Sequence, residues 1–213
     1  MKNVTLKMAT LAALLVSAGG QAAAPSAEIK VVGELIAPTC EVTLPNGGVF
    51  DFGSINHSLV SDSKPVSLGV KGGSELVVIC SASTPLTFKV VDNRLGTASE
   101  SGSEKLGLGN VNGTGKLGYY KVNAFHPQVD GQQADLFVTA GSSIPNGSVT
   151  VAFEQGKRVG WSPSGSRTLA IGKSFSFMMT VEAFLAKRTD MQGGIGEGVS
   201  LDGSTTLEFG FGL

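Results

Sequence analysis

The sequence predicts an all-β fold built as a two-sheet sandwich, on the strength of three observations. Short segments of alternating apolar and polar side chains recur along the chain, bounded by Gly, Asn, Ser or Pro, as is typical of half-buried strands. Glycine makes up 30 of the 213 residues, about twice its usual share of roughly 7%. Runs of Ala, Leu, Glu and Lys, which favour helices, are missing after the N-terminal apolar segment.

The first residues are interpreted as an export signal, residues 1–23. Lys2 and Lys7 precede an apolar run, 8–18, which is too short to span a bilayer, and the small residues 22–24 offer a cleavage site. A membrane anchor is the alternative, but no later segment approaches the roughly 18 continuous apolar residues that a membrane helix needs. The mature chain is therefore expected to be soluble and exported.

The remaining chain is expected to form a short N-terminal extension, residues 24–36, and one β-domain, residues 37–213. About 190 residues suffice for one well-buried core. The net charge is −1, from 16 Lys and Arg against 17 Asp and Glu, and becomes −3 once Lys2 and Lys7 are removed. This balance argues against nucleic acid or anionic lipid as a partner.

The predicted strands follow in order and have short connections. They cover residues 28–35, 39–44, 49–55, 75–81, 85–91, 118–125, 135–140, 148–154, 174–186 and 205–213. In 174–186 the odd positions form one continuous apolar face, and a helix is disfavoured there because β-branched and aromatic residues dominate and no cap precedes them. The stretch 95–118 is rich in Gly, Ser and charge, so we expect a long surface loop.

Cys40 and Cys80 are the only cysteines. In an exported protein an even pair indicates a disulfide, and each cysteine shares a strand face with apolar neighbours, so both sulfurs are expected to point into the core. Closing a loop of about 40 residues stabilises a fold by roughly 4 kcal/mol on the chain-entropy model. A redox or metal pair is the weaker alternative because no Cys-x-x-Cys spacing and no nearby histidine are present.

No motif supports a catalytic or cofactor site, and we expect neither a cofactor, a metal nor an enzyme. His57 and His126, the only histidines, are interpreted as turn residues. "GWSPSG", 160–165, lacks the final glycine of a nucleophile elbow and is interpreted as a turn that packs Trp161. "GTGKLG", 113–118, fits the dinucleotide pattern by chance, since no βαβ unit surrounds it. A hydrolase that uses carboxylates remains a third, weaker hypothesis.

Apolar and polar residues alternate near both ends of the chain. Near the N-terminus Ile29, Val31, Gly33 and Leu35 share one face, and at the C-terminus Leu207, Phe209, Phe211 and Leu213 share another. Both could be ordinary edge strands of a closed domain. A long apolar edge is nevertheless an aggregation hazard that proteins usually cover, unless pairing with another chain is its purpose.

These features together resemble the chaperone-usher fimbrial subunits of Gram-negative bacteria. The resemblance rests on "VVGELIAPTCEV", on the following "FDFGSI", on the Cys40 to Cys80 spacing and on the alternating C-terminus. Three further stretches, "FKVVDNR" (88–94), "LGLGNVNGTGKLGYYKV" (106–122) and "LDGSTTLEF" (201–209), resemble a fimbria-related branch known mainly as a domain of unknown function. The likeness extends over nearly all of the mature chain.

The resemblance implies an immunoglobulin-like sandwich that lacks its last strand and has a hydrophobic groove beside its C-terminal strand. A periplasmic chaperone would fill this groove first. An outer-membrane usher would then replace the chaperone strand with the N-terminal extension of another fimbrial subunit, giving a head-to-tail polymer on the cell surface. Ile29, Val31, Gly33 and Leu35 would be the donor residues, and the C-terminal face 207–213 would receive them.

The leading hypothesis is therefore a structural subunit of a surface fimbria that supports adhesion. The alternative is a secreted or fibre-tip binding module with a closed β-sandwich, for which the 95–118 loop and Trp161 would form the contact surface. An N-terminal donor strand favours the first hypothesis, because a tip protein does not need one.

Overall fold

The computed structural model describes residues 25–196 and 198–213, and the chain divides into two units, Met1–Ile36 and Ala37–Leu213. The predicted export signal, 1–23, lies outside the described residues. In the first unit, residues 25–36 form neither helix nor strand, so the strand predicted over 28–35 is absent. Alternation in a sequence records which side chains can share a face, but a strand also requires a hydrogen-bonded neighbour.

The second unit confirms the all-β prediction, and the helical pieces among its described residues are two short 3₁₀ turns. Its elements are β1 (Cys40–Thr43), η1 (Pro45–Gly48), η2 (His57–Leu59), β2 (Val66–Asp92), β3 (Leu106–Gly107), β4 (Asn110–Val111), β5 (Gly115–Lys116), β6 (Gly118–Val129), β7 (Gln132–Thr139), β8 (Thr150–Ala152), β9 (Arg158–Pro163), β10 (Ile171–Leu185) and β11 (Thr205–Phe211).

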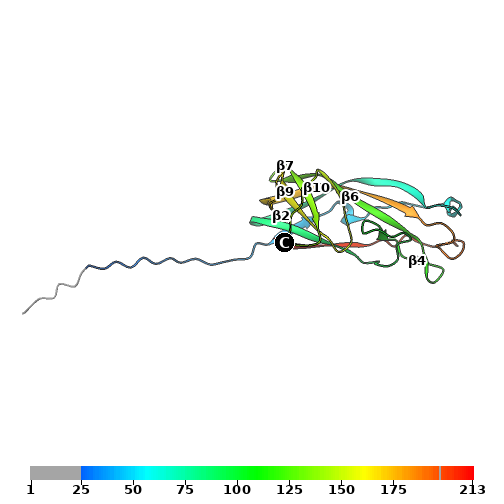
Figure 1. The fold of residues 1–213 in the computed structure, drawn as a ribbon, viewed down its shortest axis with the longest axis horizontal. Coiled ribbons are helices and arrows are strands. Elements are labelled where there is room, and N and C mark those ends of the chain that lie inside the picture. Colours follow the sequence, from blue (N-terminus) through cyan, green and yellow to red (C-terminus); the bar gives the residue numbers. More distant parts are fainter. Residues whose placement is uncertain (1–24, 197) are drawn as a thin grey trace, which may run out of the picture. The chain divides into compact units, whose positions relative to one another are not determined.

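The main sheet closes on itself as a barrel, with further strands at its margins. Its order is β2, β10, β6, β7 and β9, and β9 pairs back with β2 (Figure 1). All of these pairings are antiparallel. β1 and β11 add to β2, β3 and β8 add to β6, and β4 pairs with β5 in a separate two-stranded sheet.

Strand β2 joins the two sides of the barrel. Its first part pairs with β10 up to Ile79 opposite Ser174, and the next pair is Thr84 opposite Gly172, so β2 bulges between them. Its last part pairs with β9 and β11. The strands predicted separately at 75–81 and 85–91 are therefore one bent strand, because a bulge lets a strand change direction without ending.

Three sequence predictions are corrected here. The stretch 49–55 is not a strand, because its backbone has no ladder partner among the described residues. The stretch 158–163 is strand β9, so Trp161 lies in a strand instead of a turn. The stretch 95–118 is not a simple surface loop, since it holds three short strands and buries Leu106, Leu108 and Leu117. Leucine alternates with glycine from Leu106 to Gly109, and the high glycine content made this strand pattern look like a loop.

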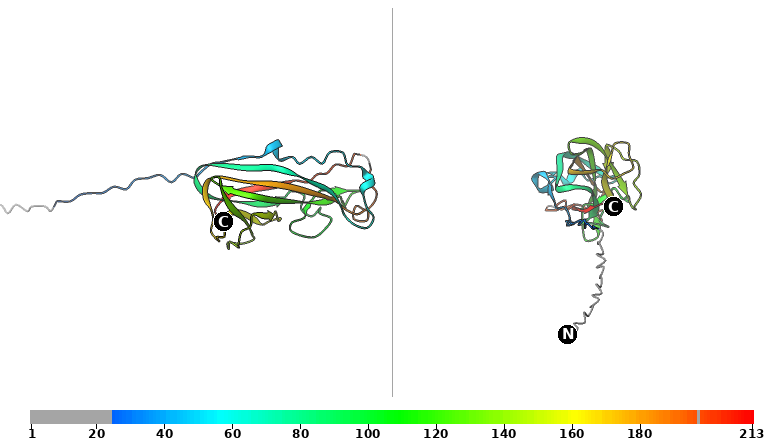
Figure 2. Two further views of the ribbon diagram at one scale, coloured as in Figure 1. Left: turned by 90° about the horizontal axis from the view of Figure 1, so that it is seen from above. Right: turned by 90° about the vertical axis from the view of Figure 1, so that its left-hand side faces the viewer.

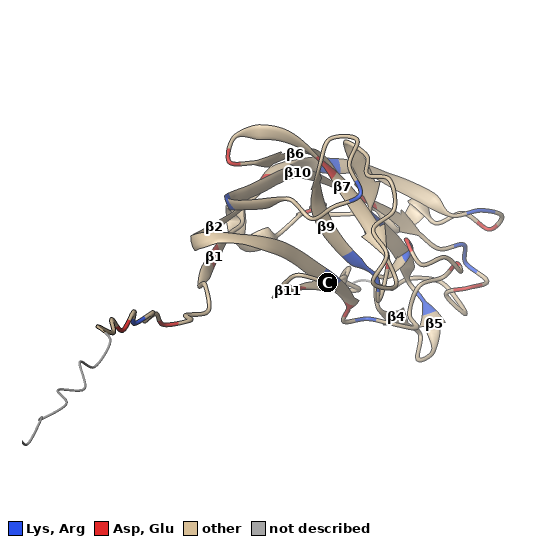
Figure 3. Cartoon of the chain, turned by 60° about the vertical axis from the view of Figure 1, so that its left-hand side comes forward, with Lys and Arg blue, Asp and Glu red and all other residues tan. Residues whose placement is uncertain are grey.

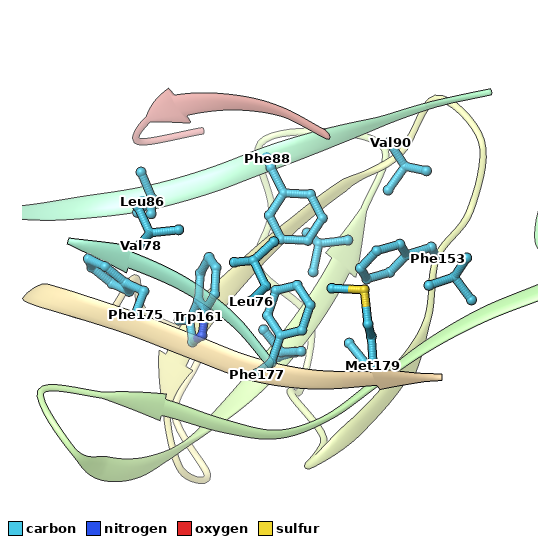
Figure 4. Close-up of a cluster of buried hydrophobic side chains, with 14 of the residues drawn as sticks. Leu76, Val78, Leu86, Phe88, Val90, Phe153, Trp161, Phe175, Phe177 and Met179 are labelled. Atoms are coloured by element: carbon cyan, nitrogen blue, oxygen red, sulfur yellow. The ribbon is translucent and has the colours of Figure 1, made fainter. Parts of the chain in front are cut away.

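The closed side of the barrel holds an aromatic core. Phe88 of β2, Trp161 of β9 and Phe177 of β10 are fully buried, with ring centroids 5.7 to 5.9 Å apart (Figure 4). The Trp161 indole N–H donates to the Ser176 carbonyl oxygen at 3.2 Å. The predicted apolar face of β10 is confirmed, because every odd residue from Phe175 to Leu185 is buried. These aromatic contacts add to what burial alone contributes.

The predicted disulfide is confirmed. Cys40 lies directly opposite Cys80 in the β1–β2 ladder, and the two residues are bonded with their Cα atoms 4.0 Å apart. Cys80 is buried and Cys40 is partly buried against the same core. The bond therefore fixes β1 to β2 at the point where the domain begins.

Candidate apolar groove beside the C-terminal strand

A groove with a volume of about 960 Å³ lies in the second unit, between residues of the segment 44–57 and residues of the segments 195–196 and 198–207. Its floor consists of alternate residues of two neighbouring strands, because Tyr120 and Val122 of β6 stand opposite Ala183 and Val181 of β10. The floor residues are Tyr120, Val122, Met179, Val181, Ala183 and Leu185. All six are at least nine-tenths buried, so the floor continues the core of the domain.

The first wall is the coil that follows β1. Phe50 and Phe52 are partly buried, whereas Val49 and Asp51 are exposed, so the burial pattern alternates as far as Gly53, and Ile55 is the next partly buried residue. Phe50 and Phe52 pack against the main core. In Figure 2 (left) this blue-to-cyan segment runs along the domain as coil. The wall thus has strand-like side-chain placement without strand pairing.

The second wall is strand β11 and the segment before it. β11 pairs with β2 from Thr205 opposite Asp92 to Phe211 opposite Leu86, and it has no other ladder partner among the described residues. Just outside this ladder Asn93 N–H donates to Ser204 O, and Gly212 N–H donates to Pro85 O. Hydrogen-bonded pairs alternate in an antiparallel ladder, so the backbone N–H and C=O groups of the even-numbered residues of β11 point toward β2. The backbone groups of Thr205, Leu207, Phe209 and Phe211 therefore point away from β2, toward an open edge.

Polar contacts hold this second wall in place. The Arg94 guanidinium forms a two-pronged ion pair with the Asp202 carboxylate, with both nitrogen-to-oxygen distances at 2.7 Å. The Asn93 side-chain amide donates to Ser204 Oγ at 2.9 Å. The hydrogen bond and charge of Arg94 lower the pKa of Asp202, and those of Asp202 raise the pKa of Arg94. The start of β11 is thereby tied to the turn after β2.

Tyr120 connects the floor to the second wall. Its hydroxyl shares a hydrogen bond with the Thr205 hydroxyl. Burial raises the pKa of Tyr120 to about 12, against an ordinary value of 10.0. The ring thus occupies the floor beneath Thr205 and remains neutral over the physiological pH range.

The predicted residues of the C-terminal face divide into two pairs. Leu207 lines the groove, and both Leu207 and Phe209 pack against the core, with the Phe209 and Phe88 ring centroids 5.3 Å apart. Phe211 and Leu213 are 51% and 43% exposed, although the alternation predicted an inward position for them. Alternation assigns them to the same face as Leu207, but the core does not extend beneath them.

The predicted donor residues lie in the first unit. Ile29, Val31 and Leu35 are all at least 89% exposed in that unit. A Cβ atom added at Gly33 would meet no atom within 4 Å. These side chains are therefore available to another surface.

The two histidines lie in different elements of the second unit. His57 lies in η2 and lines the groove, and His126 lies within β6 with a positive φ of 51°, so it occupies a bulge and not a turn. Residues 160–165 belong mainly to β9 and its following turn. Between Pro25 and Leu213, Glu197 aside, no group of three or more His, Cys, Asp or Glu side chains could hold a metal ion.

The sequence did not identify Leu108, Leu117 and the β10 residues as parts of a groove. Their alternation marks them as buried, but only the fold shows which buried positions lie beside an unpaired edge. Charged residues of both signs are scattered over the loops and edges (Figure 3). None of the described helices is long and apolar enough to cross a bilayer.

Comparison with known proteins gives one match. The model of a family described as "Protein of unknown function (DUF1120)" matches residues 29–121, which is less than half of the chain. No curated protein and no solved structure matches the sequence. The matched region begins inside the N-terminal extension and contains both cysteines and the first wall of the groove.

Proposed function

We propose that the protein is a structural subunit of a surface fimbria, assembled by the chaperone-usher route through strand donation. The observation that carries this proposal is the open edge of β11 beside an apolar groove. An unpaired edge over an apolar floor is the geometry to which an extended segment of another chain can add as a strand. The second unit would then correspond to an immunoglobulin-like sandwich whose last strand comes from a partner.

The N-terminal extension has the chemistry that such a groove requires. Ile29, Val31, Gly33 and Leu35 alternate with Glu28, Lys30 and Glu34, so one face is apolar and the other remains hydrated. The family match begins at Ile29, which makes the extension part of the pattern shared with that family. In transit through the periplasm a chaperone would supply the missing strand, and an outer-membrane usher would exchange it for the extension of the next subunit.

The energies are sufficient for a stable polymer. Burying the side chains of Ile29, Val31 and Leu35 contributes roughly 1.5 to 3 kcal/mol each, before the cost of ordering the segment. Each new backbone hydrogen bond to the open edge of β11 adds about 0.5 to 1.5 kcal/mol. A head-to-tail contact that does not close into a ring builds a filament.

Gel migration of surface extracts, with and without boiling, tests the proposal. We expect a ladder of polymers that collapses to one monomer band on boiling. Deleting Ala24–Lys30 should greatly reduce the ladder while leaving a chain that still binds a chaperone, because the donor strand is cut short at Ile29 and the groove is kept.

A peptide of residues 25–36 gives the matched control. Added to the deletion variant, it should raise the temperature of unfolding, whereas the same peptide with Val31→Asp should not. A deletion variant that assembles as well as the full chain would contradict the proposal. So would a full-length monomer that refolds reversibly and ignores the peptide, and this result would favour the closed binding module.

A further inference from the structure

The outward faces of the extension and of β11 carry charges that fit in one alignment. Glu208 is the only charged residue of β11, and it is exposed. The extension has a single cation, Lys30, between Glu28 and Glu34. We propose, resting on the function proposed above, that the groove accepts the extension of a second copy of this chain, antiparallel to β11, with Lys30 opposite Glu208.

The charges favour this register over the registers that are shifted by a few residues. A slip by one residue would turn the apolar face of the extension outward, so only slips by two are relevant. Such slips place Glu28 or Val32 opposite Glu208, and a slip by four places Glu34 there. Opposite charges that face each other across a ladder are favourable and like charges are unfavourable. Only one of these alignments pairs a cation with Glu208.

The inward residues fit the groove in the same register. Val31 then lies opposite Leu207, Gly33 opposite Thr205 and Leu35 opposite Gly203. Thr205 is hydrogen-bonded to Tyr120, whose ring lines the groove, so a residue without a side chain suits this position.

Gly203 lies close against the groove lining. A Cβ atom added at Gly203 would stand 2.7 Å from the Tyr120 ring and 3.0 Å from Leu108, so these two side chains already fill the space beside it. In the proposed register Leu35 would lie opposite Gly203, where it would meet Tyr120 and Leu108, which both line the groove.

A parallel strand with the same charge pair fits worse. Gly33 would then lie opposite Phe211 and Leu35 opposite Leu213. Neither Phe211 nor Leu213 lines the groove, whereas Thr205, Gly203 and Leu207 do. The antiparallel direction therefore places the donor side chains over the apolar floor.

Cysteine pairs test the register without removing the charge pair. Even-numbered residues of the two strands would form non-hydrogen-bonded pairs, with Cα atoms about 4.5 Å apart, a separation that suits a disulfide. Full-length chains carrying Val32→Cys are mixed with chains carrying Thr206→Cys, and Glu28→Cys with Gly210→Cys. The matched off-register pairs are Val32→Cys with Ser204→Cys, and Val32→Cys with Gly210→Cys.

We expect boiled, non-reducing gels to show a linked dimer at least about threefold stronger for the in-register pairs than for the others. Stronger linkage of an off-register pair, or equal linkage of all pairs, would overturn the register. If polymers formed only when a different subunit was added, the donor would not be a second copy of this chain. The absence of any heat-labile polymer, with any subunit, would instead contradict the proposed function itself.

Charge reversal gives a second readout. Lys30→Glu should reduce polymer formation, and a mixture of the Lys30→Glu chain with a Glu208→Lys chain should restore it, because each foreign pair again has opposite charges. Lys71→Glu, a reversal at an exposed position on β2, is the control and should leave assembly unchanged. Equal polymer yields from Lys30→Glu and the unmodified chain would contradict the charge pair.

Discussion

The aromatic core and the apolar groove are built from the same strands, yet only one of them is closed by backbone pairing. Around Phe88, Trp161 and Phe177, strands β2, β9, β7 and β6 follow one another without a gap in the ladder. Over Tyr120 and Val181 the floor is equally apolar, but its two walls are a coil and a one-sided strand.

This difference shows that the groove results from missing backbone pairing and not from a lack of apolar residues. β10 contributes Phe177 to the core and Val181 to the groove, and both side chains are buried. No hydrogen-bonded strand lies between the walls, so the backbone groups of β11 that point away from β2 have no ladder partner among the described residues. Four predictions test this contrast, from the largest expected effect to the smallest.

Trp161→Ala should lower the free energy of unfolding by about 3 to 5 kcal/mol, because it leaves a cavity in the fully closed side. Chemical denaturation followed by circular dichroism measures this loss. Phe211→Ala is the matched control at the open end, where the side chain is half exposed, and it should change stability by about 0.5 kcal/mol or less. Similar losses in both variants would mean that the two regions are equally closed.

Replacing both cysteines, Cys40→Ala with Cys80→Ala, should cost about 2 to 5 kcal/mol. The pair fixes β1 beside β2 and so holds the start of the first wall. Denaturation of the purified variant measures the cost, and reduction of the unmodified chain with dithiothreitol should give a similar value. An unchanged midpoint would show that β1 is held by its ladder alone.

Tyr120→Phe should destabilise the domain by about 0.5 to 1.5 kcal/mol, since it removes the bond to Thr205. The folded pKa of about 12 lies above the ordinary 10.0. The stabilisation from the neutral hydroxyl is therefore complete below pH 10 and is lost as the pH rises toward 12. Ultraviolet absorbance of phenolate should show this late titration, and a midpoint near 10 would contradict the burial of Tyr120.

Asp202→Asn should have the smallest effect on global stability, because the Arg94 pair is exposed. Its effect should be local: the backbone amides of residues 198–204 should exchange their hydrogens with solvent faster than in the unmodified chain. The pKa of Asp202 is lowered below 3.8 in the folded chain, so its contribution is present above that value and is lost as the pH falls through the lowered pKa. Unchanged exchange at pH 7 in the variant would exclude a role in holding the wall.

The even number of cysteines in a chain expected to be exported predicted the disulfide, and the alternation of the sequence was enough to predict an all-β fold and the buried face of β10. It placed 49–55 and 28–35 in strands, because it records side chains and not hydrogen-bond partners. It missed β9, where Gly160 and Pro163 interrupt the pattern around Trp161, and it missed the buried leucines among the glycines of 106–117. The groove could not be predicted from periodicity, since it depends on which edges remain unpaired after β2 bends.

The bent strand β2 has a mechanical consequence for any fibre built in the proposed way. Both the β1 ladder, locked at Cys80, and the β11 ladder, from Leu86 to Asp92, are attached to this one strand. Tension entering at Cys40 and leaving through a strand held beside β11 would pass along β2, loading its hydrogen bonds in shear. The resistance of each subunit to pulling would then depend on a single segment and on the covalent bond at one end of it.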